Sequence, residues 1–351
     1  MRFLFWIPNS PVARGGISVV IDVISVLNTH GIAAFALHDR PDFEYDRHAI
    51  RAPRLWSPVT RPPRETFTVR STLRRLRDDL LGQNQAPPGN ADNCPEWKFE
   101  PGDIVVVPEY VSDWMPAGLP RHVPLVLFNQ GPFLLFRAFG SSGFDADRFA
   151  DCVSTSEACA AADRMVLGKK SKRIPLFLSE DVYSYQETKS FQVAYMPRKR
   201  GQDARILVEA LEAHADLAGV PFVAIDGVST SEAARILRES LFFLSFSERE
   251  GFGLPAAEAM ATGALVIGYS GIGGDEFFDA TTGFKVPEDN LMKFYDEAVS
   301  VISGYRENKP ELDEKRRHAS KAILGKYNRE RFETEVVRVF SEIANNTSGK
   351  S

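Results

Sequence analysis

The chain has 351 residues, of which 44% are hydrophobic and 25% are charged, a composition typical of a soluble globular protein with room for two domains. Its formal net charge of −5 argues against nucleic acid as a partner. The three cysteines, Cys94, Cys152 and Cys159, show no metal-ligand spacing and leave an odd thiol, which indicates a reducing compartment.

The first half of the chain alternates predicted strands and helices. It opens with the strand RFLFWI, whose apolar run is too short for a signal-peptide core. No later stretch reaches the roughly 18 apolar residues of a membrane span, so we expect a cytoplasmic protein that could still sit on a membrane surface. A helix at 16–31 and a strand at 32–38 follow. Apolar runs within 102–110, 123–131 and 151–157 are typical of strands buried on both faces of a parallel sheet.

One segment of this half is strongly basic. From Arg47 to Arg77 the sequence contains nine arginines and a single acidic residue, Glu65. Such a run is either a solvated loop and helix face or a surface for an anionic acceptor or an anionic lipid. It is the local basis for expecting peripheral contact with the inner face of a membrane.

The second half repeats the alternation. It predicts strands at 191–197, 220–226, 240–247 and 264–270, with helices at 203–219, 229–240 and 255–263 between them. We therefore predict an α/β protein with two Rossmann-like, doubly wound domains that face each other across a cleft, because ligands bind such sheets at the carboxyl ends of their strands. The expected domains are residues 1–182 and 183–326, and the C-terminal helix at about 327–346 should cover the first domain.

Residues 248–263, EREGFGLPAAEAMATG, form the main candidate site. A buried strand ends, a glycine turn follows, and a helix begins, with Pro255 at its first position and Gly263 as its C-terminal cap. Glu250 lies in the turn, and Glu258 is expected in the first turn of the helix. Glycines in such a turn let backbone amides approach a ligand, and a carboxylate can accept hydrogen bonds from both hydroxyls of a ribose.

This segment resembles the E-x7-E motif of retaining glycosyltransferases of family 4 (glycosyltransferase group 1), which have the GT-B fold. The run LVIGYSGIGGDEFFDATTGFKVPED resembles the family's following segment. The resemblance implies that Glu250, Gly251, Phe252, Gly253 and Leu254 contact the donor sugar and that Glu258 binds the ribose of a nucleotide-diphosphate sugar. Gly15 and Gly16 match the family's first glycine turn, and Gly274 and Glu276 match positions near the nucleotide.

The leaving nucleotide diphosphate needs positive charge, and the stretch AYMPRKRGQDA stands where the family carries arginine and lysine. The resemblance implies phosphate contacts from Arg198 and Arg200 and, less directly, from Lys199. The sequence shows no Asp-x-Asp pair at a strand end and no His/Cys/Asp cluster, so we expect no metal and no cofactor besides the donor.

The family's mid-domain histidine is replaced by Asn129 and Gln130 in the stretch PLVLFNQGPF. An amide can bind a sugar hydroxyl but cannot act as a base. Asn129, Gln130 and Glu109 are therefore candidates for the acceptor or sugar side.

The resemblance predicts transfer of a sugar to an acceptor hydroxyl of a glycan or a lipid-linked molecule, in bacterial cell-surface polysaccharide or glycolipid synthesis. Two alternatives stay open at this point. One is a GT-B nucleotide-sugar epimerase, which would need acid and base groups in the cleft. The other is a degenerate, non-catalytic nucleotide-sugar-binding partner of a glycan-assembly complex. The basic loop in AYMPRKRGQDA is shorter than the family's, and this and the missing histidine favour the binding partner, whereas the intact pair of glutamates opposes it.

Overall fold

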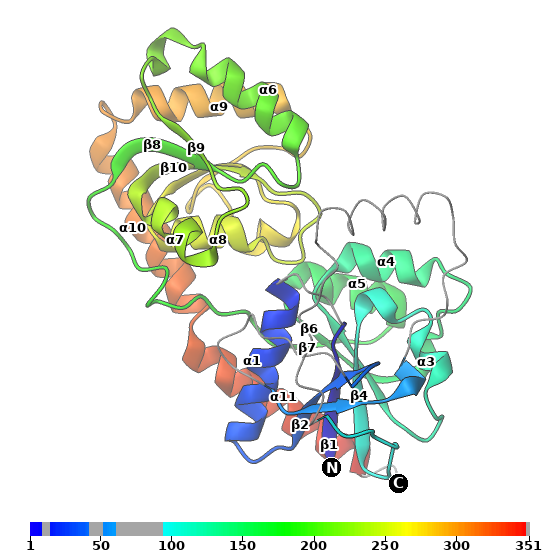
Figure 1. Cartoon of the computed structure of the whole chain (residues 1–351). Helices are drawn as coiled ribbons and strands as arrows, with labels where there is room; N and C mark the ends of the chain where they lie inside the picture. Colours follow the sequence, from blue (N-terminus) through cyan, green and yellow to red (C-terminus); the bar gives the residue numbers. More distant parts are fainter. Residues whose placement is uncertain (9–14, 42–51, 61–93, 349–351) are drawn as a thin grey trace. The chain divides into compact units, whose positions relative to one another are not determined.

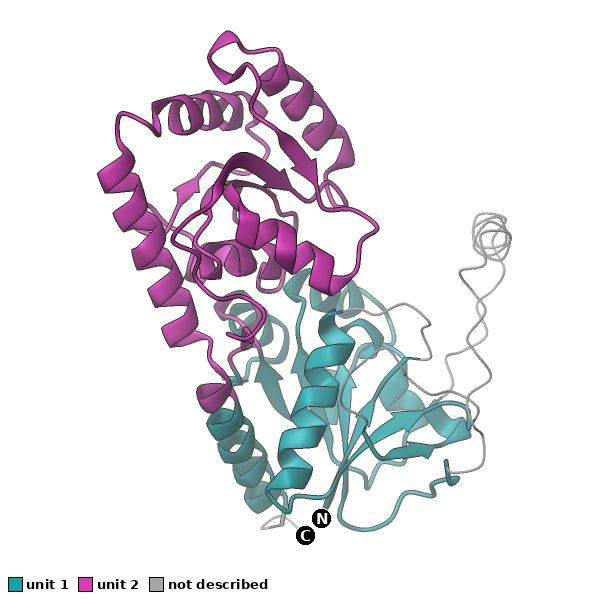
Figure 2. Cartoon of the chain, turned by 60° about the vertical axis from the view of Figure 1, so that its left-hand side comes forward, with its two compact units in different colours: residues 1–154, 160–174, 333–351 teal, residues 155–159, 175–332 magenta. Residues whose placement is uncertain are grey.

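The computed structural model describes residues 1–8, 15–41, 52–60 and 94–348, and the basic segment Arg47–Arg77 lies largely outside these ranges. The chain divides into two compact units, coloured separately in Figure 2. Unit 1 comprises residues 1–154, 160–174 and 333–351, and unit 2 comprises 155–159 and 175–332. We expected the division after residue 182, whereas the contacts group residues 175–182 with unit 2.

Unit 1 is built on a parallel sheet with the strand order β3-β2-β1-β4-β5-β6-β7. Its strands are β1 (Arg2–Trp6), β2 (Ala34–His38), β3 (Arg54–Trp56), β4 (Asp103–Pro108), β5 (Leu125–Asn129), β6 (Phe149–Ser154) and β7 (Lys172–Arg173). Its helices are α1 (Gly15–Thr29), η1 (Pro58–Thr60), η3 (Glu109–Val111), α3 (Met115–Gly118), α4 (Pro132–Phe139), η4 (Ala146–Arg148) and α5 (Glu157–Leu167). The first four strands of this order, β3-β2-β1-β4, match the Rossmann arrangement, in which the strand order changes direction between β1 and β4.

The core of unit 1 follows from the apolar runs in the sequence. All six residues of β4 and all five of β5 are buried, as strands covered on both faces require. The C-terminal helix α11 (Arg329–Ser348) contributes to this core, because Phe340 packs against Phe3 and Phe5 of β1 with ring centroids 4.9 Å and 5.3 Å apart. Figure 1 shows this helix beside the sheet of the first strands.

Unit 2 is built on a second parallel sheet, with the strand order β12-β11-β10-β8-β9. Its strands are β8 (Ser190–Tyr195), β9 (Phe222–Ala224), β10 (Ser240–Phe246), β11 (Leu265–Tyr269) and β12 (Phe284–Lys285). Its helices are α6 (Gly201–Glu212), η5 (Ala215–Leu217), α7 (Thr230–Glu239), α8 (Leu254–Ala261), η6 (Gly273–Glu276), α9 (Leu291–Gly304) and α10 (Lys309–Lys326). The chain turns from β9 back past β8 to β10, which places the switch point of a doubly wound sheet between β8 and β10.

Three local expectations for unit 2 need correction. The helix predicted at 203–219 ends at Glu212, and the short turn η5 follows and buries Leu217. Helix α8 begins at Leu254, with Gly253 as its N-cap at φ 94°, so Pro255 is its second residue. Glu258 is consequently the fifth residue of α8 and lies beyond the first turn.

Both ends of the α7–α8 region show regular helix caps, and the cap predicted at Gly263 is confirmed. The hydroxyl of Ser229 accepts a hydrogen bond from the backbone N–H of Glu232 at 3.2 Å, which starts α7 as a capping residue should. Gly263 follows α8 with φ 80°, the left-handed conformation that terminates helices. Among the described residues, no helix combines the length and the apolar character that crossing a membrane requires.

Candidate functional site

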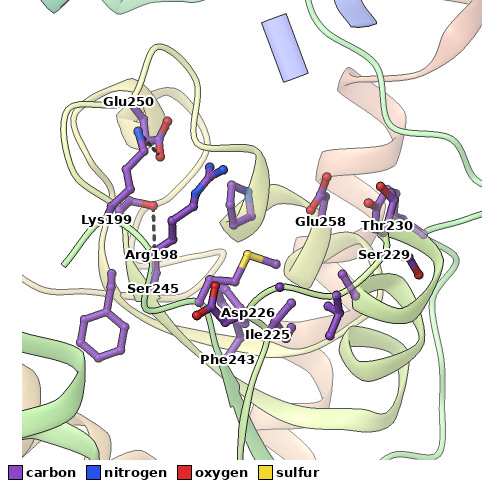
Figure 3. Close-up of a pocket in the computed structure, with 18 residues that line it drawn as sticks. Arg198, Lys199, Ile225, Asp226, Ser229, Thr230, Phe243, Ser245, Glu250 and Glu258 are labelled. Carbon is purple, nitrogen blue, oxygen red and sulfur yellow. Dashed lines mark hydrogen bonds and ion pairs between the residues drawn. The ribbon is translucent and has the colours of Figure 1, made fainter. Parts of the chain in front are cut away.

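A pocket of about 300 Å³ opens in unit 2 at the carboxyl ends of β8, β9 and β10 (Figure 3). This is the edge of the sheet at which doubly wound folds bind ligands. The pocket is lined by Tyr183, Met196, Arg198, Lys199, Ile225, Asp226, Gly227, Val228, Ser229, Thr230, Ala233, Phe243, Ser245, Phe246, Ser247, Glu250, Pro255 and Glu258. Both glutamates of the motif therefore line one pocket.

One end of the pocket carries the positive charge. Lys199 forms an ion pair with Glu250, with 2.9 Å between Nζ and Oε1, and also donates to the backbone oxygen of Glu248 at 3.3 Å. Figure 3 shows the guanidinium of Arg198 pointing into the pocket on the same side as Glu250. Two cations thus stand beside the first carboxylate of the motif, where an anionic group could bind.

Arg200 does not line this pocket. Its guanidinium pairs with Glu288 at 2.9 Å and with Asp289, and it stacks on the ring of Tyr269, 4.6 Å from the centroid. The side chain is only 9% exposed. Glu288 in turn accepts a hydrogen bond from the backbone N–H of Gly271 at 2.8 Å. Arg200 therefore helps to hold the loop after β11 in place, whereas we expected its side chain to contact the phosphates of the donor.

The other end of the pocket holds Glu258, Ser229 and Thr230, as Figure 3 shows. Burial raises the pKa of the half-buried Glu258 to about 7, and the influence of the Tyr183 hydroxyl on this carboxyl group opposes that rise. Hydroxyl groups and a carboxylate can together bind the hydroxyls of a ligand.

The glycine turn after β10 lies against the loop after β11. The N–H of Glu250 donates to the backbone oxygen of Gly271 at 2.9 Å. A Cβ on Gly273 would lie 2.5 Å from the carbonyl oxygen of Glu250, so this position requires glycine. The close contact fixes the backbone that carries the first motif carboxylate.

Ile272 in this loop has a strained backbone. Its φ of 68° and ψ of −50° and the 2.8 Å hydrogen bond from the N–H of Gly273 to the oxygen of Gly271 define a γ-turn of the rare positive-φ type. A β-branched residue seldom adopts this conformation. The side chain is 45% exposed, and its backbone pairs with Glu250. The strain is thus located beside the candidate site.

Several residues that we expected at the donor do not line the pocket. Phe252 is 4% exposed and packs against Phe277 and Tyr327, with centroids 5.0 Å and 4.8 Å apart. Gly251, Leu254 and Gly274 also lie outside the lining, and Gly253 serves as the N-cap of α8. The side chain of Phe252 is therefore part of the core, because a large aromatic ring is stabilised by burial.

Glu276 is bound within unit 2 and likewise does not line the pocket. Its Oε2 accepts from the backbone N–H of Glu157 at 2.6 Å, and its Oε1 accepts from the hydroxyl of Tyr327 at 2.6 Å. These contacts tie the start of α5 to the turn before α11.

In unit 1, the expected acceptor-side residues follow β4 and β5. Glu109 is 3% exposed and accepts a hydrogen bond from the N–H of Gln130 at 3.2 Å. The amide of Gln130 donates to the backbone oxygen of Gly16 at 3.1 Å, next to Gly15 at the start of α1. The structure thus brings Glu109, Gln130 and the two glycines together.

Asn129 is fully buried. Its Nδ2 donates to Asp163 at 2.7 Å, and its Oδ1 accepts from the N–H of Gly131 at 3.0 Å. Burial raises the pKa of Glu109 to about 7 and that of Asp163 to about 6. Of the three acceptor-side candidates, Gln130 is the one with a partly exposed side chain.

Sequence reasoning missed the side of the pocket formed by Tyr183 and by residues 225–230. The signal was present, since IDGVST (residues 225–230) spans the end of the predicted strand 220–226, and strand ends carry ligands in this class of fold. Tyr183 precedes the first strand of unit 2, and its position carries no comparable signal. Within the described ranges, no group of three or more His, Cys, Asp or Glu side chains could hold a metal ion.

Comparisons with known proteins identify the class of protein to which the chain belongs. The family described as "Glycosyl transferases group 1" matches residues 189–304, which include the whole pocket except Tyr183. An alpha-1,6-glucosyltransferase of Actinobacillus pleuropneumoniae serotype 7 is 31% identical over 257 residues, covering 71% of this chain and 77% of the relative. The chain therefore belongs to the group 1 glycosyltransferases and is a glycosyltransferase.

Solved structures show the same fold over the full length. TarM of S. aureus aligns with a TM-score of 0.62 at 11% identity, covering 98% of this chain and 100% of that one. HepE of Anabaena, in complex with UDP and glucose, aligns with a TM-score of 0.58 at 15% identity, covering 99% and 100%. Sucrose-phosphate synthase of Thermosynechococcus elongatus aligns with a TM-score of 0.60 at 15% identity, covering 98% and 99%. The predicted GT-B fold is confirmed.

Proposed function

We propose that this glycosyltransferase moves a sugar from a nucleotide-diphosphate donor to an acceptor hydroxyl and retains the configuration at the anomeric carbon, as members of family 4 do. The observation that carries the proposal is the single pocket that contains Glu250, Glu258 and the cations Arg198 and Lys199. The names of the relatives support a glucosyl donor, since the curated relative is a glucosyltransferase and HepE was crystallised with UDP and glucose.

In this proposal the nucleotide lies along the pocket. Glu258 binds the ribose hydroxyls, and Ser229 and Thr230 lie at the same end. The diphosphate lies at Arg198 and Lys199, and the sugar lies at Glu250. As the glycosidic bond breaks, negative charge develops on the leaving diphosphate, and the two cations stabilise it without a metal ion.

Lys199 has two candidate partners in this scheme. One is Glu250, with which it forms an ion pair in the structure. A bound diphosphate competes for the ammonium group, which frees the Glu250 carboxylate to accept hydrogen bonds from sugar hydroxyls. We assign the phosphate role to Arg198 and Lys199, because Arg200 is held by Glu288 and Asp289.

Retention follows if the acceptor hydroxyl attacks from the side of the leaving group. The leaving phosphate oxygen then accepts the proton of the acceptor, and no protein base is required. This route suits a chain in which Asn129 and Gln130 replace a histidine. Gln130, which is partly exposed, is the candidate for acceptor contact.

For the biological setting we propose a glycan or lipid-linked acceptor in the synthesis of bacterial cell-surface polysaccharide or glycolipid. The protein would act in the cytoplasm and contact the inner membrane through Arg47–Arg77. Replacing the arginines of that segment with glutamate should abolish binding to anionic vesicles, since each basic residue near such a surface contributes about 1 kcal/mol. Equal binding of the variant, or no binding of the native chain, contradicts the membrane contact.

The proposed function is tested by release of UDP from UDP-glucose in the presence of a saccharide acceptor. Glu250→Ala should abolish transfer and leave nucleotide binding largely intact. Glu248→Ala is the matched control, because Glu248 lies two positions away and does not line the pocket, and it should retain transfer. Transfer that survives Glu250→Ala contradicts the assignment. Nucleotide binding without transfer in the native chain would instead indicate a binding partner.

A further inference from the structure

We infer that the side-chain amide of Gln130 is held with its oxygen free to accept a hydrogen bond from a hydroxyl of a saccharide acceptor, and that Asp163 and Glu109 are the positioning residues of this arrangement. The inference deepens the proposed function and rests on it for the transfer of a sugar to an acceptor hydroxyl. The hydrogen bonds that hold Gln130 all lie within unit 1.

The start of α1 fixes the orientation of the Gln130 amide. Its Nε2 donates to the backbone oxygen of Gly16 at 3.1 Å. Because a backbone oxygen can only accept, the nitrogen of the amide must face Gly16 and the oxygen must face away from that carbonyl. Among the residues that the structure describes, none donates a hydrogen bond to Oε1 of Gln130, whose side chain is partly exposed. This oxygen is therefore available to a ligand.

Two buried side chains hold the backbone of the turn that carries Gln130. The N–H of Gln130 donates to Oε2 of Glu109 at 3.2 Å, and the N–H of Gly131 donates to Oδ1 of Asn129 at 3.0 Å. Glu109 follows β4 and Asn129 ends β5, so both partners stand on the rigid sheet. Both N–H groups of the turn thus have fixed partners, which is the arrangement expected of a preorganised binding group.

Asp163 on α5 in turn fixes Asn129. Its Oδ1 accepts a hydrogen bond from Nδ2 of Asn129 at 2.7 Å, and both side chains are fully buried. This bond directs the nitrogen of the Asn129 amide to Asp163 and leaves its oxygen to the N–H of Gly131. Breaking such a bond would leave a buried polar group unpaired, which is costly. Asp163 therefore acts on Gln130 through Asn129 and the turn.

Gly131 lets the turn approach Glu109 closely. Its φ of −152° is extended backbone that any residue adopts, so conformation does not require glycine here. A Cβ at this position would lie 3.1 Å from Oε1 of Glu109, which is tighter than ordinary contact. The missing side chain thus keeps the turn against the carboxyl group that holds it.

The free oxygen of Gln130 also indicates the class of acceptor. An amide oxygen accepts a hydrogen bond from a hydroxyl but repels an anionic group that has no proton to donate. In the proposed mechanism the proton of the attacking hydroxyl passes to the leaving phosphate, so Gln130 binds a different hydroxyl of the same molecule. The acceptor therefore carries a further hydroxyl near the one that attacks, as the ring of a saccharide does.

Amide hydrogen exchange, followed by nitrogen NMR of the full chain, tests the positioning role without an acceptor. Asp163→Ala should speed exchange of the N–H groups of Gln130 and Gly131 by about tenfold, because the loss of one net hydrogen bond corresponds to about that factor. Asp163→Asn keeps an oxygen for Asn129 and should exchange like the native chain. Glu109→Ala should speed exchange at Gln130. Unchanged exchange at both positions in Asp163→Ala refutes the role of Asp163.

Asp103→Ala is the matched control for general destabilisation. Asp103 is also fully buried and also accepts hydrogen bonds, but it lies at the amino end of β4. It should lower the melting temperature without a selective change at Gln130 and Gly131, and the thermal melt of each variant measures the general loss. Equal acceleration at these two positions in Asp103→Ala and Asp163→Ala would overturn the inference.

A second measurement concerns the acceptor itself. Methyl α-glucoside, added with UDP present, should shift the side-chain amide resonances of Gln130 in the native chain. Gln130→Ala and Asp163→Ala should each weaken binding of the glucoside by about tenfold and leave the affinity for UDP unchanged, whereas Asp163→Asn should restore native binding. No shift at Gln130 in the native chain contradicts the assignment of its oxygen to a saccharide hydroxyl.

These results separate the inference from the proposed function. If the chain binds no nucleotide, the proposed function fails, but selective acceleration in Asp163→Ala still supports the positioning role. If UDP binds and exchange at Gln130 and Gly131 is the same in Asp163→Ala as in the native chain, the proposed function stands and the positioning role is refuted.

Discussion

The ammonium group of Lys199 lies 2.9 Å from the carboxylate of Glu250, so the first glutamate of the motif is paired with a lysine of the loop after β8. Both groups are partly exposed, at 36% and 19%, and an ion pair of this kind contributes little to stability. Lys199→Met should therefore leave the free energy of unfolding within about 0.5 kcal/mol. It should lower the transfer rate by about 10²- to 10³-fold if the ammonium stabilises the leaving diphosphate.

Arg200→Met is the contrasting variant for this prediction. It removes the guanidinium from Glu288, Asp289 and the ring of Tyr269, and it should cost on the order of 2 kcal/mol of folding stability in urea titrations. Loss of transfer in Arg200→Met without loss of stability would show that Arg200, and not Lys199, serves the phosphates.

Phe252 contributes to the core of unit 2 rather than to the surface of the pocket. Phe252→Ala removes a buried ring that packs against Phe277 and Tyr327 and should cost about 3–5 kcal/mol in urea or thermal unfolding. Phe252→Leu retains most of the apolar volume and should cost less. A fully stable Phe252→Ala variant with weakened donor binding would contradict this interpretation and support a direct contact with the sugar.

The strained γ-turn at Ile272 predicts a stabilising substitution. Ile272→Gly removes the steric cost of a positive φ, of order 1–3 kcal/mol, and this gain exceeds the roughly 0.5–1 kcal/mol of entropy that glycine loses on folding. The free energy of unfolding should rise by about 1 kcal/mol. Ile272→Ala keeps a Cβ at the same φ and should not show the gain. A destabilised glycine variant would show that contacts of the exposed side chain outweigh the strain.

The carboxyl of Glu109 predicts a pH dependence of stability. Its pKa of about 7 in the folded chain lies above its ordinary value, so the folded state binds more protons than the unfolded state between about pH 4.5 and 7. The contribution of Glu109 to stability is therefore present below that window and is lost as the pH rises through it.

Glu109→Gln isolates this effect, because the amide resembles the protonated acid and does not titrate. The difference in unfolding free energy between variant and native chain should grow in favour of the variant from pH 5 to pH 7, a range of roughly the titration window. His38, whose lowered pKa of about 4 acts in the opposite direction, is present in both chains and cancels. A difference that does not change with pH would show that Glu109 is ionised when folded.

The fold could be predicted from the sequence because the patterns that specify its helices and strands are local. The apolar runs of β4 and β10, the serine cap at Ser229 and the glycine at position 263 each specify an element without reference to distant residues. The helix predicted at 203–219 was too long because the apolar periodicity of the sequence continues past Glu212, where the helix ends. Leu217 continues that pattern, but it is buried by the short turn η5, and this depends on tertiary packing that the local pattern does not show.

Only the outline of the candidate site could be predicted from the sequence. The spacing of Glu250 and Glu258 indicates a ligand, and both line the pocket. Whether Lys199 or Arg200 is available to bind the phosphates depends on the ion pairs of Arg200 with Glu288 and Asp289. These two carboxylates are distant in sequence, and no local pattern reveals the pairs. The same holds for Tyr183, which lines the pocket although no local pattern marks it.

The central claim is that the pocket of unit 2 binds a nucleotide diphosphate. A thermal-shift screen of the purified chain against UDP, GDP, TDP, ADP and CDP, with and without magnesium, tests it most directly. A ligand at a hundred times its dissociation constant should stabilise the fold by about 2.7 kcal/mol, and the shift should not require magnesium and should diminish in Glu258→Ala. No shift with any nucleotide, or an equal shift in Glu258→Ala, would contradict the claim.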